Sequence, residues 1–196
     1  METYLPSAVR LESDAEVMRF ASDHVTLQGA YVELGVCLGR TVNVLAALNP
    51  KQPIYGFDSF EGLPEDWVRG DFTLPKGTYA LKDPEKEPLL LGNIELIKGW
   101  FKDSLPLFAK EKLQDQPIAF LHIDCEIYTS AAEALTILAP YIQERTILLF
   151  DELYNYPGFE NHEWKALNEF LQAHGWAADY LAYNIYHEQV VVRVRR

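Results

Sequence analysis

The sequence contains little cysteine and little positive charge, and both shortages limit what the protein can be. Two cysteines, Cys37 and Cys125, stand among 196 residues without a C-x-x-C pair, so neither a disulfide framework nor a cysteine-based zinc site is expected. Both lie within or beside apolar runs and are expected to be buried free thiols of a reducing compartment. The chain has 17 Lys and Arg against 29 Asp and Glu, a net charge of −12 that repels phosphate backbones. Nucleic acid is therefore not an expected partner.

Long apolar runs are also missing from the sequence. None approaches the roughly 20 residues that span a bilayer, so no membrane contact is expected. No apolar segment follows a basic stretch at the N-terminus, as a secretory signal would require. No Ser-His-Asp or Cys-His pattern stands out. We therefore expect a cytoplasmic protein without a serine- or cysteine-based catalytic centre.

Length and composition fit one globular domain. The hydrophobic fraction of 48% and the charged fraction of 23% are ordinary, and 196 residues can bury a core. Strand-like and helix-like segments alternate along the chain, which implies a mostly parallel sheet with right-handed crossovers. Only a short link separates the last two strands, so the last one is expected to be antiparallel. The predicted fold class is α/β, Rossmann-like, with helices on both faces.

The predicted elements follow from apolar periodicity and from start and stop signals. Helices are expected at about 14–27, 41–48, 105–112, 130–138 and 160–173. Strands are expected at about 30–34, 54–58, 94–97, 118–123, 146–150, 180–183 and 189–194. The helix near 130 should begin with a capping box formed by Ser130 and Glu133. The nearly continuous apolar run 118–123 and the apolar run 146–150 are typical of strands that are covered on both faces.

A segment of about 32 residues, from 61 to 92, shows no clear element and contains four prolines. Segments of this length are usually functional lids or disordered regions. The scattered aromatic residues Trp67, Phe72 and Tyr79 favour a lid within a single domain. The alternative is that these rings only pin a loop to the core.

Acidic side chains end several predicted strands. They are Glu33, Asp58, Asp124, Asp151 and Glu152. In an open parallel sheet, ligands bind beyond the carboxyl ends of the strands. One such residue alone could be a helix cap or a solvated turn. Together they predict a binding crevice.

A glycine-containing loop follows the strand at 30–34 and runs from Glu33 to Gly39. Its two glycines lie four residues apart, which departs from the G-x-G-x-x-G spacing of dinucleotide sites. An acid just before the loop suits a ligand with an ammonium and a sulfonium better than a pyrophosphate. Asp58, one strand later, is placed to hold two ribose hydroxyls, with a capped turn with Ser59 as the alternative.

Asp124 and Asp151 end two predicted strands that should be sheet neighbours. Neighbouring strands lie about 4.8 Å apart, so the two carboxylates can converge on one cation. Glu152 adds a third oxygen donor, and an all-oxygen set suits Mg²⁺. The alternative is an acidic cluster that shares protons or pairs with arginine.

Four sequence blocks resemble the macrocin O-methyltransferase (TylF-type) family. They are Glu33-x-Gly35-x-x-x-Gly39 and the segments 56–64 (GFDSFEGLP), 98–106 (KGWFKDSLP) and 122–130 (HIDCEIYTS). The similarity runs from about Tyr31 to the C-terminus. It implies the class I methyltransferase fold, S-adenosylmethionine as methyl donor, and Mg²⁺-dependent O-methylation, typically of a sugar hydroxyl on a natural product.

The resemblance also implies roles for individual residues. The expected cofactor-binding residues are Glu33, Gly35, Cys37, Gly39, Thr41, Asp58, Ser59, Phe60, Gly99, Trp100, Phe101 and Asp124. The expected metal ligands are Asp124, Asp151 and Glu152, with Asp124 also as the catalytic residue. Glu126 stands where the family usually has a second Asp, and it receives no role. The short N-terminus lacks the helices that cover the substrate in the antibiotic enzymes, so a large macrolide-type acceptor is not expected.

Two other functions remain open at this point. A nicotinamide-dependent oxidoreductase would share Asp58 after a glycine loop, although Glu33 and the glycine spacing argue against it. A non-catalytic module that kept the cofactor fold would have no need of the three acids that are expected to bind metal. We expect a small hydroxyl-bearing substrate and a homodimer. His187 is expected to be a surface or core histidine, with a role as base as the alternative.

Overall fold

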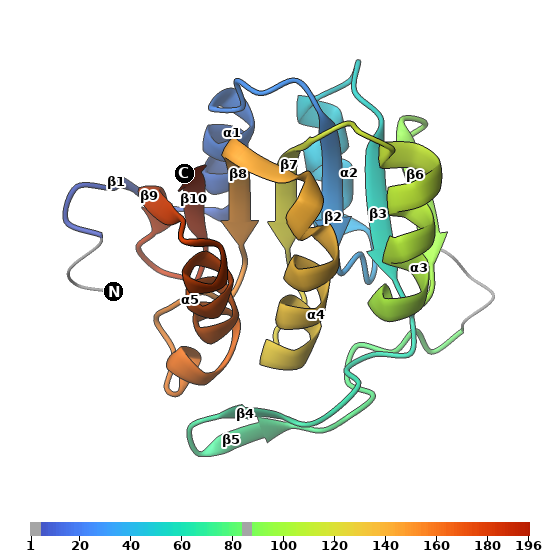
Figure 1. Cartoon of the computed structure of the whole chain (residues 1–196). Helices are drawn as coiled ribbons and strands as arrows, with labels where there is room; N and C mark the ends of the chain where they lie inside the picture. The colour runs from blue at the N-terminus through green and yellow to red at the C-terminus, as the bar shows by residue number, and fades with distance from the viewer. Residues whose placement is uncertain (1–4, 84–87) are drawn as a thin grey trace.

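The computed structural model describes residues 5–83 and 88–196 (Figure 1). Its centre is an eight-stranded sheet of order β1-β9-β10-β8-β7-β2-β3-β6. The strands are β1 (Val9–Leu11), β2 (Ala30–Leu34), β3 (Ile54–Asp58), β6 (Ile94–Lys98), β7 (Ile118–Ile123), β8 (Ile142–Phe150), β9 (Ala177–Asn184) and β10 (Val190–Arg195). Strand β10 is antiparallel to β8 and β9, and the other pairs in the sheet are parallel. The predicted α/β class with an antiparallel last strand is therefore confirmed.

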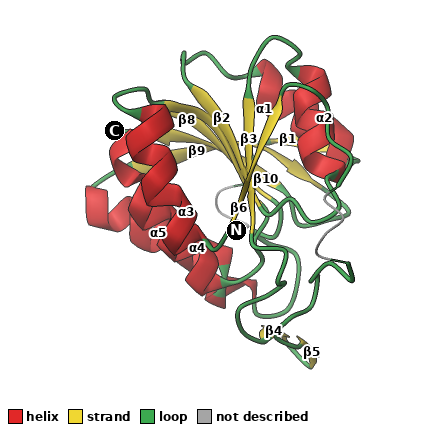
Figure 2. Cartoon of the chain, turned by 90° about the vertical axis from the view of Figure 1, so that its right-hand side faces the viewer, coloured by secondary structure: helices red, strands yellow, loops and turns green. Residues whose placement is uncertain are grey.

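Helices cover both faces of the sheet (Figure 2). One face carries α1 (Asp14–Asp23) and α2 (Arg40–Leu48), and the other carries α3 (Phe101–Phe108), α4 (Tyr128–Leu138) and α5 (Glu163–His174). Each layer buries its own apolar cluster against the sheet. Strand β7 is buried along its whole length, as its continuous apolar sequence predicted. None of the helices in the described ranges is long and apolar enough to cross a membrane.

Several local predictions are wrong at helix ends. Helix α4 begins at Tyr128 with Ile127 as its N-cap and no side-chain cap hydrogen bond, so the predicted capping box of Ser130 and Glu133 does not form there. Helix α3 begins four residues before the predicted start and continues into a π-helical turn over Ala109–Leu113. Strand β1 was not predicted, because three residues carry too little periodicity to be recognised; it pairs with β9 at the sheet edge.

The segment 61–92 contains a hairpin that the sequence analysis missed. Strands β4 (Trp67–Arg69) and β5 (Phe72–Leu74) pair antiparallel and lie beyond the carboxyl ends of the parallel strands (Figure 1). The Trp67 ring is buried against Tyr156, and the Arg69 guanidinium lies over both rings, 4.5 and 4.3 Å from their centroids. Arg69 also pairs with Glu188 at 2.7 Å. The hairpin is thus anchored to the domain, and residues 84–87 of the predicted lid lie outside the described residues.

Gly35 brings the loop after β2 into contact with the end of β7. Its φ of +96° is a left-handed conformation, and a Cβ at this position would lie 1.7 Å from the Asp124 carbonyl oxygen. The adjacent backbone is tied across the sheet, since the Asp124 N–H donates to the Leu34 carbonyl at 2.9 Å. Only glycine allows this approach. The residue therefore sets how closely the loop and Asp124 can pack.

Gly35→Ala is expected to lower the free energy of unfolding by about 2–5 kcal/mol, since left-handed strain adds to an overpacked backbone contact. Urea unfolding measures the effect. Gly92→Ala is the matched control, because a Cβ there meets nothing within 4 Å and needs no positive φ. Equal stability of the two variants would show that the loop can move away from Asp124 at little cost.

Candidate active site

A cleft of about 940 Å³ opens at the carboxyl ends of β2, β3, β7 and β8. Most residues expected at the site line it, namely Gly35, Cys37, Thr41, Asp58, Ser59, Gly99, Trp100, Phe101, Asp124, Asp151 and Glu152. Asp58 and Asp124 therefore face one crevice, as the strand-end argument required. Three expected residues, Glu33, Gly39 and Phe60, do not line the cleft.

Glu33 is fully buried beneath the glycine loop. Its Oε1 accepts a hydrogen bond from the Thr41 hydroxyl at 2.8 Å, and its Oε2 lies 3.0 Å from Nδ1 of His122. The expectation that Glu33 meets a ligand ammonium directly does not fit this position. Instead, Glu33 holds Thr41, and Thr41 lines the cleft. His122 is also fully buried.

Asp58 organises the two loops that form one side of the cleft. Its Oδ2 accepts hydrogen bonds from the N–H groups of Val36 and Cys37 at 2.9 and 2.7 Å. Its Oδ1 accepts one from the Phe60 N–H at 2.6 Å, which is a capped turn of the kind weighed as the alternative. An ionised carboxylate offers about four acceptor positions, so Asp58 retains capacity for a ligand hydroxyl. Cys37 is half-buried rather than buried, and it lines the cleft.

Carboxylates gather at the other side of the cleft. Ligand atoms of Asp124, Glu126 and Glu152 lie within 4.8 Å of one another, and so do those of His122, Asp124 and Asp151. The three predicted metal ligands are thus split between two overlapping groups that share Asp124. Strands β7 and β8 are neighbours with Ile123 opposite Phe150, which confirms the predicted adjacency.

Glu126 belongs to the site although the sequence analysis gave it no role. Its φ of +62° is unusual for a residue other than glycine, and its carboxyl group lies near those of Asp124 and Glu152. The available signal was its position two residues after a strand-end Asp, in a turn that begins a helix. Pattern alone could not show that the backbone turns this side chain back toward the cleft.

The electrostatics of the cluster fit a divalent cation. Burial, reinforced by neighbouring carboxylates, raises the pKa of Asp124, Glu126 and Glu152 well above their ordinary values. Burial also acts on Asp151, but the nearby His122 and the hydrogen bond from Gln189 outweigh it and lower its pKa. Glu152 Oε2 is buried without a hydrogen-bond partner among the described residues. An all-oxygen donor set with an unsatisfied buried oxygen suits Mg²⁺.

Glu163, in the first turn of α5, was also missed. It is fully buried, and its two carboxyl oxygens accept hydrogen bonds from the N–H groups of Cys125 and Glu152, at 3.5 and 3.2 Å. It therefore joins the turn after Asp124 to the turn after Asp151. Burial raises the pKa of Glu163 to about 8. An acid at a helix start usually indicates a solvated charge, so the sequence carried no sign of this role.

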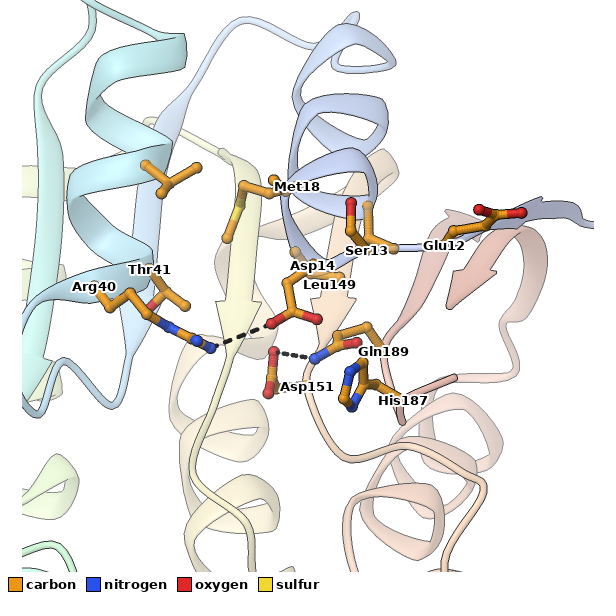
Figure 3. A pocket seen from close by; sticks show the side chains of 13 residues that line it. Glu12, Ser13, Asp14, Met18, Arg40, Thr41, Leu149, Asp151, His187 and Gln189 are labelled. Carbon is orange, nitrogen blue, oxygen red and sulfur yellow. Dashed lines mark hydrogen bonds and ion pairs between the residues drawn. The ribbon is translucent and has the colours of Figure 1, made fainter. Parts of the chain in front are cut away.

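A second cavity of about 350 Å³ lies between α1 and α2, beside the cleft (Figure 3). It shares Arg40, Thr41 and Asp151 with the cleft. His187 lines this cavity and is exposed, which is one of the two positions expected for it; a role as base stays untested. Across the cavity mouth, Arg40 pairs with Asp14 at 3.3 Å.

The metal-free protein should lose stability as the pH rises from about 5 to 8. Carboxyl groups with a raised pKa bind protons in the folded chain that the unfolded chain has already released, so unfolding is favoured as the pH increases through this window. Glu163→Gln removes one such group and should reduce the loss by up to about 1.4 kcal/mol per pH unit. Urea unfolding in EDTA at pH 5, 6.5 and 8 measures it. The exposed Glu160→Gln is the control, and equal slopes for all three proteins would contradict the assignment.

Comparison with known proteins assigns the chain to a family. Residues 32–153 match the family model of a methyltransferase domain. The match covers more than half of the chain, and the chain belongs to this family.

Two relatives from Streptomyces match part of the chain. One is the 8-demethyl-8-(2,3-dimethoxy-alpha-L-rhamnosyl)-tetracenomycin-C 4'-O-methyltransferase of Streptomyces olivaceus, 27% identical over 142 residues. The other is the demethyldecarbamoylnovobiocin O-methyltransferase of Streptomyces niveus, 29% identical over 142 residues. Each match covers 63% of this chain and 52% of the relative, so the chain spans about half the length of these relatives.

Solved structures share the fold. A calicheamicin methyltransferase superposes with a TM-score of 0.72 at 24% identity, covering 92% of this chain and 78% of that one. The O-methyltransferase NovP gives 0.66 at 19% identity, covering 93% and 79%. A methyltransferase from the mycinamycin biosynthetic pathway, in complex with Mg and SAH, gives 0.56 at 15% identity, covering 92% and 49%. The chain therefore has the Rossmann-like methyltransferase fold.

Proposed function

We propose that the protein is an S-adenosylmethionine-dependent, Mg²⁺-dependent O-methyltransferase that acts on a hydroxyl group of a small sugar or natural-product-like molecule. The observation that carries this proposal is the shared cleft, with Asp58 on one side and the carboxylates around Asp124 on the other. The first suits a ribose and the second suits a divalent cation. The names of the two Streptomyces relatives, a rhamnosyl-tetracenomycin-C 4'-O-methyltransferase and a demethyldecarbamoylnovobiocin O-methyltransferase, support the same class of acceptor.

The methyl donor would lie along the loop between β2 and α2. Trp100 and Phe101 would contact the adenine, Asp58 the ribose, and Gly35 would allow the loop backbone to approach the ligand. Thr41 would lie at the end of the donor site away from the adenine, where the cleft borders the second cavity. The nicotinamide alternative is not favoured, because the chain belongs to a methyltransferase family.

When bound, the donor would supply a sulfonium methyl group, and Mg²⁺ would polarise the acceptor hydroxyl. Asp124, Asp151 and Glu152 would hold the cation, and Glu126 is close enough to take part. Asp124 or Glu126 would accept the proton that the hydroxyl loses. Much of the rate would come from holding the acceptor oxygen in line with the methyl group.

The segment 61–92 would act as a lid. Its residues Glu61, Gly62, Leu63, Pro64, Lys76 and Tyr79 line the cleft, while its hairpin is fixed by Trp67. This placement supports a cover that excludes water from the reacting groups. The cytoplasmic location and the homodimer expected from the sequence stay predictions.

Removal of divalent metal is expected to abolish methyl transfer. The assay follows SAH formation with a panel of nucleotide-linked and free deoxysugars as acceptors, in EDTA and after addition of Mg²⁺. Asp124→Asn should lower kcat by about 100-fold or more while leaving SAH binding measurable, and the exposed Asp71→Asn serves as control. Full turnover in EDTA would exclude the metal-dependent mechanism but leave methyl transfer intact.

Asp58→Ala is expected to weaken SAH binding by about 10- to 100-fold, because hydrogen bonds to a charged acceptor contribute about 1.5–3 kcal/mol. Isothermal titration calorimetry with SAH measures the effect, and NADH is titrated in parallel. The matched control is Asp66→Ala. Asp66 accepts a hydrogen bond from the Lys76 N–H within the segment 61–92 and does not line the cleft. Tight NADH binding without SAH binding would refute the proposed function.

A further inference from the structure

We propose that His122 is a positioning residue at the centre of a buried network, formed by Thr41, Glu33, His122 and Asp151, that makes binding of the methyl donor and of the divalent cation depend on each other. The inference rests on the proposed function, because it assigns the two ends of the network to the donor and the metal. It adds a role for two residues, Glu33 and His122, that do not reach the cleft.

The network crosses three adjacent strands of the sheet. Glu33 on β2 stands opposite His122 on β7, and His122 stands opposite Leu149 on β8, two residues before Asp151. The Thr41 hydroxyl donates to Glu33 at 2.8 Å, Glu33 lies 3.0 Å from Nδ1 of His122, and Nε2 of His122 lies 3.7 Å from Oδ1 of Asp151. These contacts run from the start of α2 to Asp151, the residue after β8, and the last of them is longer than a hydrogen bond.

The two middle residues of the network are buried, whereas the two end residues line cavities that a ligand can enter. Glu33 and His122 are 0% exposed. Thr41 and Asp151 line both the cleft and the second cavity, where Figure 3 shows Asp151 beside Gln189. The two buried side chains therefore connect two residues that can each meet a ligand.

Both contacts of Asp151 in this network are made by one of its carboxyl oxygens, Oδ1. Its Oδ1 receives the hydrogen bond from Gln189 Nε2 at 3.1 Å and faces His122 Nε2. Gln189 is itself fixed, since its Oε1 accepts a hydrogen bond from Asn184 at 2.9 Å. Nε2 of His122 is buried and makes no hydrogen bond of normal length within the described ranges. The ring is thus placed so that Nε2 can form a hydrogen bond to Asp151 when a cation fixes that carboxylate.

Mutual dependence follows from this shared element. A donor that fixes Thr41 fixes Glu33 and the ring, so less ordering remains to be done when the cation binds Asp151. By linkage, each ligand must raise the affinity of the other by the same factor. We expect the factor to be about fivefold or more, measured by titrating Mn²⁺ with and without saturating SAH, and SAH with and without saturating Mn²⁺.

Two variants of His122 separate its two contacts. The amide of Asn stands where Nδ1 stood, so H122N keeps the contact to Glu33 and loses the one to Asp151. The longer Gln places its amide near Nε2, so H122Q keeps the reach to Asp151. H122N should bind SAH alone within threefold of the parent protein, bind Mn²⁺ at least tenfold more weakly, and show a coupling factor near one. H122Q should bind Mn²⁺ within threefold of the parent protein.

A coupling factor in H122N equal to that of the parent protein would overturn the proposal. So would an equal loss of both affinities in H122N and H122Q, which would indicate a general structural role. Imidazole nitrogen coupling in the electron spin echo spectrum of bound Mn²⁺ would make His122 a metal ligand instead.

The Thr41 end gives an independent test if neither His122 variant folds. Thr41→Val removes the donor to Glu33 and should abolish the coupling, whereas Thr41→Ser keeps the hydroxyl and should retain it. Coupling that survives in Thr41→Val would overturn the proposal. Failure of the parent protein to bind SAH or Mn²⁺ would refute the proposed function, while binding of both without coupling would refute only the network.

Discussion

Repulsion among buried carboxylates is the interaction around which this structure is arranged. Parallel strands that end at one edge of the sheet bring Asp124 and Asp151 together, and the turns that follow add Glu126 and Glu152. Such a group is costly to bury unless protons, hydrogen bonds or cations balance it. The protein supplies part of the balance through His122 beside Asp151 and leaves the rest to protons or a metal. The site is therefore a region of low stability that a cation would strengthen.

The parts of the fold that could be predicted are those with a strong local signal. The strands at 30–34 and 118–123 were predicted with the bounds that β2 and β7 have. The second was recognisable because a strand covered on both faces is almost entirely apolar. The hairpin of β4 and β5 was not predicted, since each strand has three residues and depends on contact between Trp67 and Tyr156, far apart in sequence. Local pattern carries no information on such a contact.

The same distinction applies to the site. Strand-end acids were found because their place in the chain fixes their edge of the sheet, and Asp58 and Asp124 do share a cleft. The orientation of a side chain was beyond the sequence. Glu33 points beneath the loop rather than into the cleft, and Glu163 reaches back from a helix start to two backbone N–H groups. Both orientations depend on tertiary contacts between residues that lie far apart in the sequence or on different elements.

Arg69 contacts the rings of Trp67 and Tyr156 and pairs with Glu188, so it connects three parts of the chain that are distant in sequence. Tyr156 follows β8, and Glu188 belongs to the turn that leads into β10, next to His187 in the second cavity. Outward swinging of the hairpin must break a stacked guanidinium and an ion pair at once. The hairpin is therefore held against the domain by contacts that need no ligand in the cleft.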